Sequence, residues 1–178
     1  MEHYTMNPAL IPTVPGHFET DDFVFFWSGP FSNWYKSDFS VPDGLAKGDY
    51  TSSEQAMMIA KARMFGDITA ACEIMATNNP RRQKEIGRSV KGFDAVRWQS
   101  ECVPIITDVL VHKFDQNDDL FKILMNTNDK IIVEASPFDD VWGIKMGVDH
   151  ADILDQTKWQ GKNYLGICLM NARERLKG

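Results

Sequence analysis

A series of helix-start signals along residues 52–163 constrains the fold of this chain more than any other feature of its sequence. Each signal is a serine, aspartate or asparagine before a helix-forming segment, where its side chain can accept a hydrogen bond from a free backbone N–H. Ser52 or Ser53 starts a helix that runs to Gly66, with Glu54 in its first turn. The other predicted starts are Asp67, Asn79 before Pro80, Asp94, Asn117 and Asn163, and the last helix runs to Leu176.

Pro104 falls inside the segment that follows Asp94, although the apolar residues on either side of it keep a helical spacing. A proline inside a helix has no N–H to donate and its ring clashes with the preceding turn. We therefore expect Pro104 either to kink this helix or to mark its true start.

Two short stretches have the composition of buried strands. Residues 23–27 are aromatic and β-branched and are bounded by acids and by a Ser-Gly-Pro turn, and residues 131–135 form a similar apolar run. Helices outnumber strands and do not alternate with them regularly. The sequence therefore predicts an α+β fold, a mainly helical single domain around a small β-sheet.

The length of 178 residues, of which 43% are hydrophobic, suits one domain and is too short for two. Residues 1–20 contain Pro8, Pro12 and Pro15 and have no sustained periodicity. We expect them to form an N-terminal arm that packs in extended form or stays mobile, and we expect the domain itself over residues 21–178.

Charge and cysteine content exclude several classes of protein. The net charge of −6 and the pI near 5.2 argue against sequence-independent binding to nucleic acid, which needs many lysines and arginines. The three cysteines are far apart and predict neither a zinc site nor a disulfide framework, and the histidines show no metal-ligand spacing. With no membrane-spanning stretch and no signal-peptide pattern, we expect a cytoplasmic protein without a metal or cofactor.

The turn Gly161-Lys162-Asn163 runs directly into the last predicted helix. Such a turn can offer backbone N–H groups, the positive end of a helix dipole and a cation to one anion, for which phosphate is the obvious candidate. The alternative is a simple turn with an N-cap, which is equally frequent for this pattern. The segment does not match the phosphate-binding loop G-x-x-x-x-G-K-[ST], and no dinucleotide-binding G-x-G-x-x-G occurs.

Glu54 and Lys61 are seven residues apart, which places both side chains on one helix face about 10 Å apart along the axis. This distance is too long for a direct ion pair, but the two groups can contact different ends of one ligand. The more common reason for such a spacing is a solvent-exposed helix face.

Other candidate ligand-binding residues are acidic, aromatic or basic. Asp139 and Asp140 precede Trp142 and Gly143 in a loop after a buried strand, where catalytic groups are often presented, although an aspartate turn fits equally well. Trp34 and Trp98 can stack on a planar ring, but tryptophan is more often part of the core. A basic cluster, formed by Arg81, Arg82, Lys84 and Arg88, can meet phosphate or simply face solvent.

Together these segments resemble the NADAR family of YbiA-like proteins, which is named for a link to NAD and ADP-ribose, and the resemblance covers most of the chain. The matching pieces keep their order along the sequence. They are Phe31-Ser32-Asn33, Thr51 to Gln55 with Lys61, Gly87-Arg88, Trp98, Lys113-Phe114, Val133-Glu134, Asp140-x-Trp142-Gly143, Gly161-Lys162-Asn163-x-Leu165-Gly166, Met170 and the segment from Arg173 to Leu176.

The resemblance implies an N-glycosidase that cleaves the bond between an amine and the anomeric carbon of ribose phosphate or ADP-ribose. Family substrates are riboflavin-pathway intermediates, or guanine that carries ADP-ribose, including guanine in nucleic acid. In this interpretation Glu54, Lys61 and Asp140 are catalytic, with Lys61 able to form a Schiff base with the opened sugar. The expected substrate-binding residues are Phe31, Ser32, Asn33, Arg88, Trp98, Trp142, Gly143, Lys162 and Asn163.

Two alternatives remain open at the level of sequence. One is a binding module that recognises ADP-ribose or an NAD derivative without cleaving it. The other is an interaction protein whose N-terminal segment docks a partner chain. The sequence does not reveal the leaving amine, whether the substrate is free or in nucleic acid, or the oligomeric state.

Overall fold

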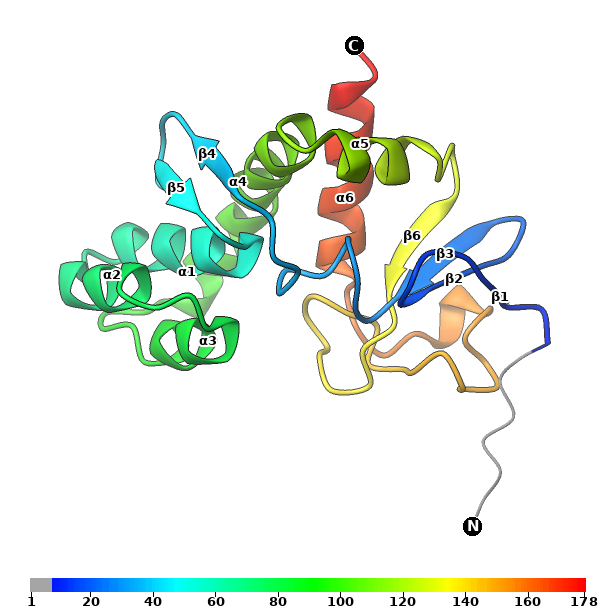
Figure 1. The fold of residues 1–178 in the computed structure, drawn as a ribbon. Helices are drawn as coiled ribbons and strands as arrows, with labels where there is room; N and C mark the ends of the chain where they lie inside the picture. The colour runs from blue at the N-terminus through cyan, green and yellow to red at the C-terminus, as the bar shows by residue number, and fades with distance from the viewer. Residues whose placement is uncertain (1–7) are drawn as a thin grey trace.

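Strand β3 (Phe23–Phe26) lies inside a four-stranded sheet in the order β1-β2-β3-β6, as seen in a computed structural model that describes residues 8–178 (Figure 1). β1 and β2 are antiparallel to their neighbours, whereas β3 and β6 are parallel. Phe26 pairs with Glu134, so the carboxyl ends of the two parallel strands lie side by side. The other strands of this sheet are β1 (Ile11–Pro12), β2 (His17–Glu19) and β6 (Ile131–Glu134).

All four side chains of β3 are buried because both faces of the sheet are covered. Val24 and Phe26 point to the larger hydrophobic core, and Phe23 and Phe25 point to a second, smaller one. The larger core lies between the sheet and the helices, and the smaller one lies between the sheet and apolar residues of the segment 144–159.

Among residues 8–178, six α-helices form the rest of the fold. α4 packs against α6 and α1, while α1 also packs against α2 and α3, so the first three helices form a separate group beside the sheet (Figure 1). This arrangement confirms the predicted α+β class. The helices are α1 (Ser53–Met64), α2 (Ile68–Met75), α3 (Pro80–Arg88), α4 (Ala95–Asp115), α5 (Asp118–Met125) and α6 (Tyr164–Leu176), and a short 3-10 helix, η1 (Gln156–Lys158), precedes α6.

Most of the predicted helix starts are capped as expected. The side chains at four of these positions, Ser52, Asp67, Asn79 and Asp94, accept hydrogen bonds from backbone N–H groups of the first turn. Asn117 precedes α5, but its side chain donates to the carbonyls of Asp38 and Lys113 and does not cap the helix.

Pro104 lies inside α4, so the interpretation that it marks the start of this helix is wrong. Buried residues on both sides of the proline hold the helix against the core. They include Cys102, Ile106, Val109 and Leu110. No helix of residues 8–178 is both long enough and apolar enough to cross a membrane.

Two further features did not follow from the sequence. A small antiparallel pair of strands, β4 (Phe39–Val41) and β5 (Gly48–Tyr50), precedes α1. Arg63 of α1 donates hydrogen bonds to backbone carbonyls in the turn that connects β4 to β5. The predicted N-terminal arm supplies β1 and β2, so the sheet contains residues on both sides of the predicted boundary at residue 20. Residues 1–7 of that arm lie outside the described part of the chain.

Candidate active site

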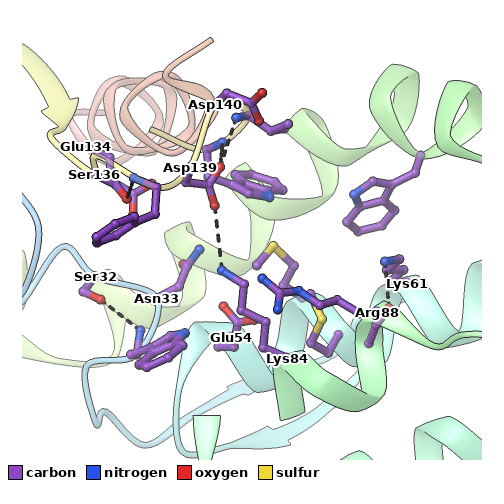
Figure 2. Close-up of a pocket in the computed structure, with 18 of the residues that line it drawn as sticks. Ser32, Asn33, Glu54, Lys61, Lys84, Arg88, Glu134, Ser136, Asp139 and Asp140 are labelled. Carbon is purple, nitrogen blue, oxygen red and sulfur yellow. Dashed lines mark hydrogen bonds and ion pairs between the residues drawn. The ribbon is translucent and has the colours of Figure 1, made fainter. Parts of the chain in front are cut away.

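A pocket of about 770 Å³ opens between the group of helices α1 and α3 and the carboxyl ends of β3 and β6 (Figure 2). This volume is within the usual range for small-molecule sites. The loops after β3 and β6 and the start of α4 complete its walls. Its charged lining residues are Glu54, Lys61, Arg81, Lys84, Arg88, Glu134, Asp139 and Asp140, and its aromatic lining residues are Trp27, Trp34, Phe93, Trp98, Phe138 and Trp142.

Glu54 is held in the first turn of α1 by contacts on both sides of the helix start. Ser52 accepts a hydrogen bond from the Gln55 N–H at 3.3 Å, which closes the cap. The carbonyl of Asn33 accepts a hydrogen bond from the Glu54 N–H at 2.8 Å. The loop after β3 and the start of α1 are therefore joined at the residue that faces the pocket.

The carboxyl group of Glu54 is nearly removed from solvent, with 2% of the residue exposed. Its Oε1 atom has no hydrogen-bond partner within residues 8–178. Burial raises the pKa of Glu54 to about 7, even though Lys84, the Trp34 side chain and Arg88 favour the charged form. A carboxyl group in this state can both give and take a proton near neutral pH.

The loop that carries Ser32 and Asn33 rests on a buried lysine. The ammonium group of Lys113, from α4, donates to the carbonyls of Pro30 and Ser32 at 3.0 and 3.3 Å. Because Lys113 is completely buried, its pKa is lowered to about 7. Asn33 is also buried, and its Oδ1 atom has no partner in the described structure, so this atom is available to a ligand.

Glu134 is the last residue of β6 and lies across the pocket from α1 (Figure 2). Its Oε2 atom is buried and has no hydrogen-bond partner among the described residues. Burial, together with the charges of Asp139 and Glu54, raises the pKa of Glu134 to about 8 against the opposing effect of Lys84. Two carboxyl groups with raised pKa values thus share one pocket.

Lys61 lines the same pocket as Glu54, so the helix face predicted from their spacing is turned toward the pocket. Its Nζ atom donates to the carbonyl of Gly87 at 2.7 Å and lies 4.0 Å from the centre of the Phe93 ring. Gly87 permits this close packing of α3 on α1, because a Cβ atom there would overlap the Sδ atom of Met58. Burial lowers the pKa of Lys61, which favours a free amine.

The basic cluster divides between two faces of α3. Arg81, Lys84 and Arg88 line the pocket, as expected for residues three, four and seven positions apart on a helix. Arg82 instead pairs with a neighbouring glutamate in solvent, and Gln83 is buried and donates to a backbone carbonyl. One helix face thus directs three cations into the site.

Asp139 and Asp140 differ in their surroundings. Asp139 accepts hydrogen bonds from the N–H groups of Val141 and Trp142 at 3.0 and 2.7 Å, so the aspartate-turn alternative is realised there. Its other oxygen lies 3.7 Å from the ammonium group of Lys84, and this ion pair spans the pocket (Figure 2). Asp140 lines the pocket from a more exposed position. Its catalytic role remains a prediction.

The Gly161-Lys162-Asn163 turn does not present its N–H groups to the pocket. The backbone N–H groups of residues 162–165 all donate to the carbonyls of residues 140–143, at 2.9 to 3.1 Å. The prediction that these groups bind phosphate is therefore wrong. The alternative is correct in its turn but not in its N-cap, because the Asn163 side chain makes no capping hydrogen bond to α6. The Lys162 side chain contacts Gln99 at 3.0 Å and is not part of the lining.

The structure thus brings eight predicted site residues around one pocket and leaves four outside its lining. Phe31 is fully buried and stacks on His17 at 4.3 Å, so it supports the core and does not face a ligand. Gly143 packs against the carbonyl of Glu134. The residues outside are Phe31, Gly143, Lys162 and Asn163, and those around the pocket are Ser32, Asn33, Glu54, Lys61, Arg88, Trp98, Asp140 and Trp142.

Sequence reasoning gave no role to Glu134, and it considered Lys84 and Asp139 only as members of a basic cluster and of an acidic pair. A lone acid at the end of an apolar strand was the available signal for Glu134, and the helical spacing of the basic cluster was the signal for Lys84. Within residues 8–178, no group of three metal-ligating side chains is placed to hold an ion.

Known proteins place this geometry in a family. An N-glycosidase of Acanthamoeba polyphaga mimivirus is 39% identical over 165 residues, which cover 88% of this chain and 97% of the viral protein. The chloroplastic riboflavin biosynthesis protein PYRR of Zea mays is 29% identical over 96% of this chain but over 27% of its own length. The NMR structure of the E. coli protein YbiA matches with a TM-score of 0.69 and 28% identity, covering 91% of this chain and 89% of YbiA. The model of the NADAR domain matches residues 25–177, and the chain belongs to the NADAR family.

Proposed function

We propose that this protein is an N-glycosidase that hydrolyses the bond between an amine and the anomeric carbon of ribose phosphate or ADP-ribose. The observation that carries the proposal is the buried Glu54, whose unpartnered Oε1 atom lines the same pocket as Lys61. A buried carboxyl oxygen without a protein partner is costly to fold, and such a cost is typical of a group kept for a ligand. The activity named for the viral relative supports the same reaction class.

In this proposal Glu54 is the catalytic carboxyl group, which exchanges protons with the reacting groups and faces the positive charge that develops at the anomeric carbon. The reaction breaks the carbon–nitrogen bond, gives a proton to the departing amine and places the oxygen of water on the anomeric carbon. Positioned carboxyl groups contribute to such steps by proton transfer and by charge stabilisation.

Lys61 provides a covalent route to the same products. When the sugar ring opens, the nitrogen lone pair forms a carbon–nitrogen double bond, and the amine of Lys61 adds to that carbon. The original amine then leaves with a proton, and water hydrolyses the remaining lysine imine to release the sugar. The lowered pKa of Lys61 supports this role, because the attacking form is the uncharged amine.

The phosphate groups of the substrate are assigned to α3. Arg81, Lys84 and Arg88 line the pocket from one helix face, and arginine is well suited to bidentate contacts with phosphate. The overall charge of −6 does not oppose this assignment, because the three cations are local to the pocket.

The experiment is incubation of the protein with a ribosylaminopyrimidine 5′-phosphate and with a DNA strand that carries ADP-ribosylated guanine, followed by mass spectrometry of the released sugar. Glu54→Gln is the test variant, and Glu73→Gln, an exposed glutamate on α2, is the matched control. We expect release by the parent protein and the control only. Tight binding of ADP-ribose, with no sugar released by the parent or by either variant, would support a binding module and refute the proposed enzymatic activity.

The covalent route has its own measurement. Borohydride reduction during turnover should trap the sugar on Lys61, and peptide mass spectrometry should locate it there, with Lys61→Arg as the control. An adduct on a surface lysine, or full turnover by Lys61→Arg, would leave direct attack by water as the mechanism.

A further inference from the structure

The end of strand β6 is fixed from two directions at Glu134. The side chain of Asn163 accepts a hydrogen bond from the Glu134 N–H at 3.0 Å and donates to the carbonyl of Ile132 at 2.9 Å. On the other side, the Ile144 N–H donates to the Glu134 carbonyl at 3.0 Å. The backbone that carries the Glu134 side chain into the pocket is therefore rigidly placed.

Two glycines make this support possible. A Cβ atom on Gly143 would lie 2.9 Å from the carbonyl oxygen of Glu134, too close for the loop to keep its hydrogen bond. A Cβ atom on Gly166 would overlap the carbonyl oxygen of Ile132 and the side chain of Asn163. The Trp-Gly and Gly-Lys-Asn motifs of the sequence thus share one structural task, which is to hold the end of β6.

The side chain supported in this way has no partner of its own in the described structure. Glu134 Oε2, Glu54 Oε1 and Asn33 Oδ1 are all buried, unpartnered and part of the same pocket. They come from the end of β6, the start of α1 and the loop after β3. Three orphaned oxygens from three elements indicate a ligand that donates hydrogen bonds to them, as sugar hydroxyls and a protonated amine do.

We infer that Glu134 is a second catalytic carboxyl group, which gives its proton to the departing nitrogen while the ionised Glu54 takes a proton from the attacking water. This inference rests on the proposed N-glycosidase function. The carbon–nitrogen bond breaks as the nitrogen receives the proton of Glu134, and the carbon–oxygen bond forms as water loses a proton to Glu54. The pair regains its starting state when the proton returns from Glu54 to Glu134.

The surroundings of the two groups agree with these roles. Lys84 favours and Asp139 disfavours the charged form of both groups. The Trp34 side chain and Arg88 favour the charged form of Glu54, whereas the charge of Glu54 disfavours the charged form of Glu134. These surroundings favour the proton of the pair on Glu134 and the charge on Glu54. The charged groups that face the pair are Lys61 from α1, Lys84 and Arg88 from α3, and Asp139 from the loop after β6.

The test compares two leaving groups on the same ribose 5-phosphate, aniline bound through its nitrogen and 4-nitrophenol bound through its oxygen. Aniline must receive a proton to leave as a neutral amine, whereas 4-nitrophenol leaves as a stable phenolate anion that needs no proton. We expect Glu134→Gln to lose about 10²–10⁴-fold in turnover with the aniline compound but less than about tenfold with the nitrophenol compound. Glu54→Gln should lose activity on both, because the water step still needs its carboxylate.

A pH profile gives an independent readout on any substrate that the parent protein cleaves. The value of kcat/KM should rise as the pH passes about 7, where Glu54 ionises, and fall as the pH passes about 8, where Glu134 loses its proton. Glu134→Gln should abolish the fall, which a residue with a merely structural role would leave in place.

Three results separate the possible failures. Full turnover by Glu134→Gln, or an equal loss on both leaving groups with an unchanged pH profile, would overturn the role of Glu134 alone. A parent protein that releases the leaving group from neither probe, and from neither the pyrimidine substrate nor the guanine substrate, would refute the proposed function, and the inference with it.

Discussion

Glu54→Gln should make the protein more stable above neutral pH while it removes most of the activity. The pKa of Glu54 rises from 4.5 to about 7 in the folded state because the carboxyl group is buried. Below pH 4.5 the Glu54 carboxyl group is protonated in both the folded and the unfolded chain and has no effect on stability. As the pH rises from 4.5 to about 7, the unfolded chain releases this proton first, so the folded state loses stability over that window.

Above about pH 7 the penalty of the ionised Glu54 is complete, and the rise in pKa corresponds to about 3 kcal/mol. A glutamine of the same shape carries no charge and avoids this penalty. We therefore expect the free energy of unfolding of Glu54→Gln to exceed that of the parent by about 2–3 kcal/mol at pH 8, and by less than about 1 kcal/mol at pH 5. Turnover by the same variant should fall by about 10²–10⁴-fold.

Urea unfolding of both proteins at the two pH values measures the first effect, and sugar release measures the second. Glu73→Gln controls for the loss of one negative charge from the molecule. Equal stabilities at pH 8, or a variant that is less stable there, would refute the conclusion that Glu54 is held at a cost. A variant with parental turnover would remove Glu54 from the mechanism.

Three further changes test other parts of the site. Asn163→Ala should destabilise the fold by about 1–3 kcal/mol, because it orphans the N–H of Glu134 and a neighbouring carbonyl, and it should lower kcat; urea unfolding and kinetics measure both. Gly87→Ala should lower thermal stability and the yield of borohydride-trapped adduct, because the new methyl group overlaps Met58 and shifts the backbone carbonyl that accepts from Lys61. Arg88→Ala should weaken ADP-ribose binding in calorimetry, whereas Lys162→Ala should not. Weaker binding by Lys162→Ala with unchanged binding by Arg88→Ala would instead place the phosphate at the turn before α6.

The sequence was a good guide wherever a feature depends on near neighbours in the chain. Ser52, Asp67, Asn79 and Asp94 cap their helices because a cap is a contact over two or three residues. The shared orientation of Glu54 and the lysine seven residues later also follows from helix geometry alone.

Features that depend on distant pairing did not follow. Glu134 reaches the pocket because β6 lies parallel to β3, more than a hundred residues earlier, and no local pattern sets that register. The turn before α6 has the composition of an anion site, but carbonyls from residues 140–143 occupy its N–H groups. Whether a donor is free is a property of the tertiary structure.

The side chain of Asn163 also covers the outer edge of strand β6. β6 is an edge strand, and its outer N–H and carbonyl groups near Glu134 would otherwise be open to pairing with a strand of a second molecule. At the opposite edge, β1 is only two residues long and one of them is Pro12, which has no N–H to donate. Both margins of the sheet thus resist the strand-to-strand association that leads to aggregation. We expect Asn163→Ala to form particles in light scattering at concentrations where the parent stays dispersed.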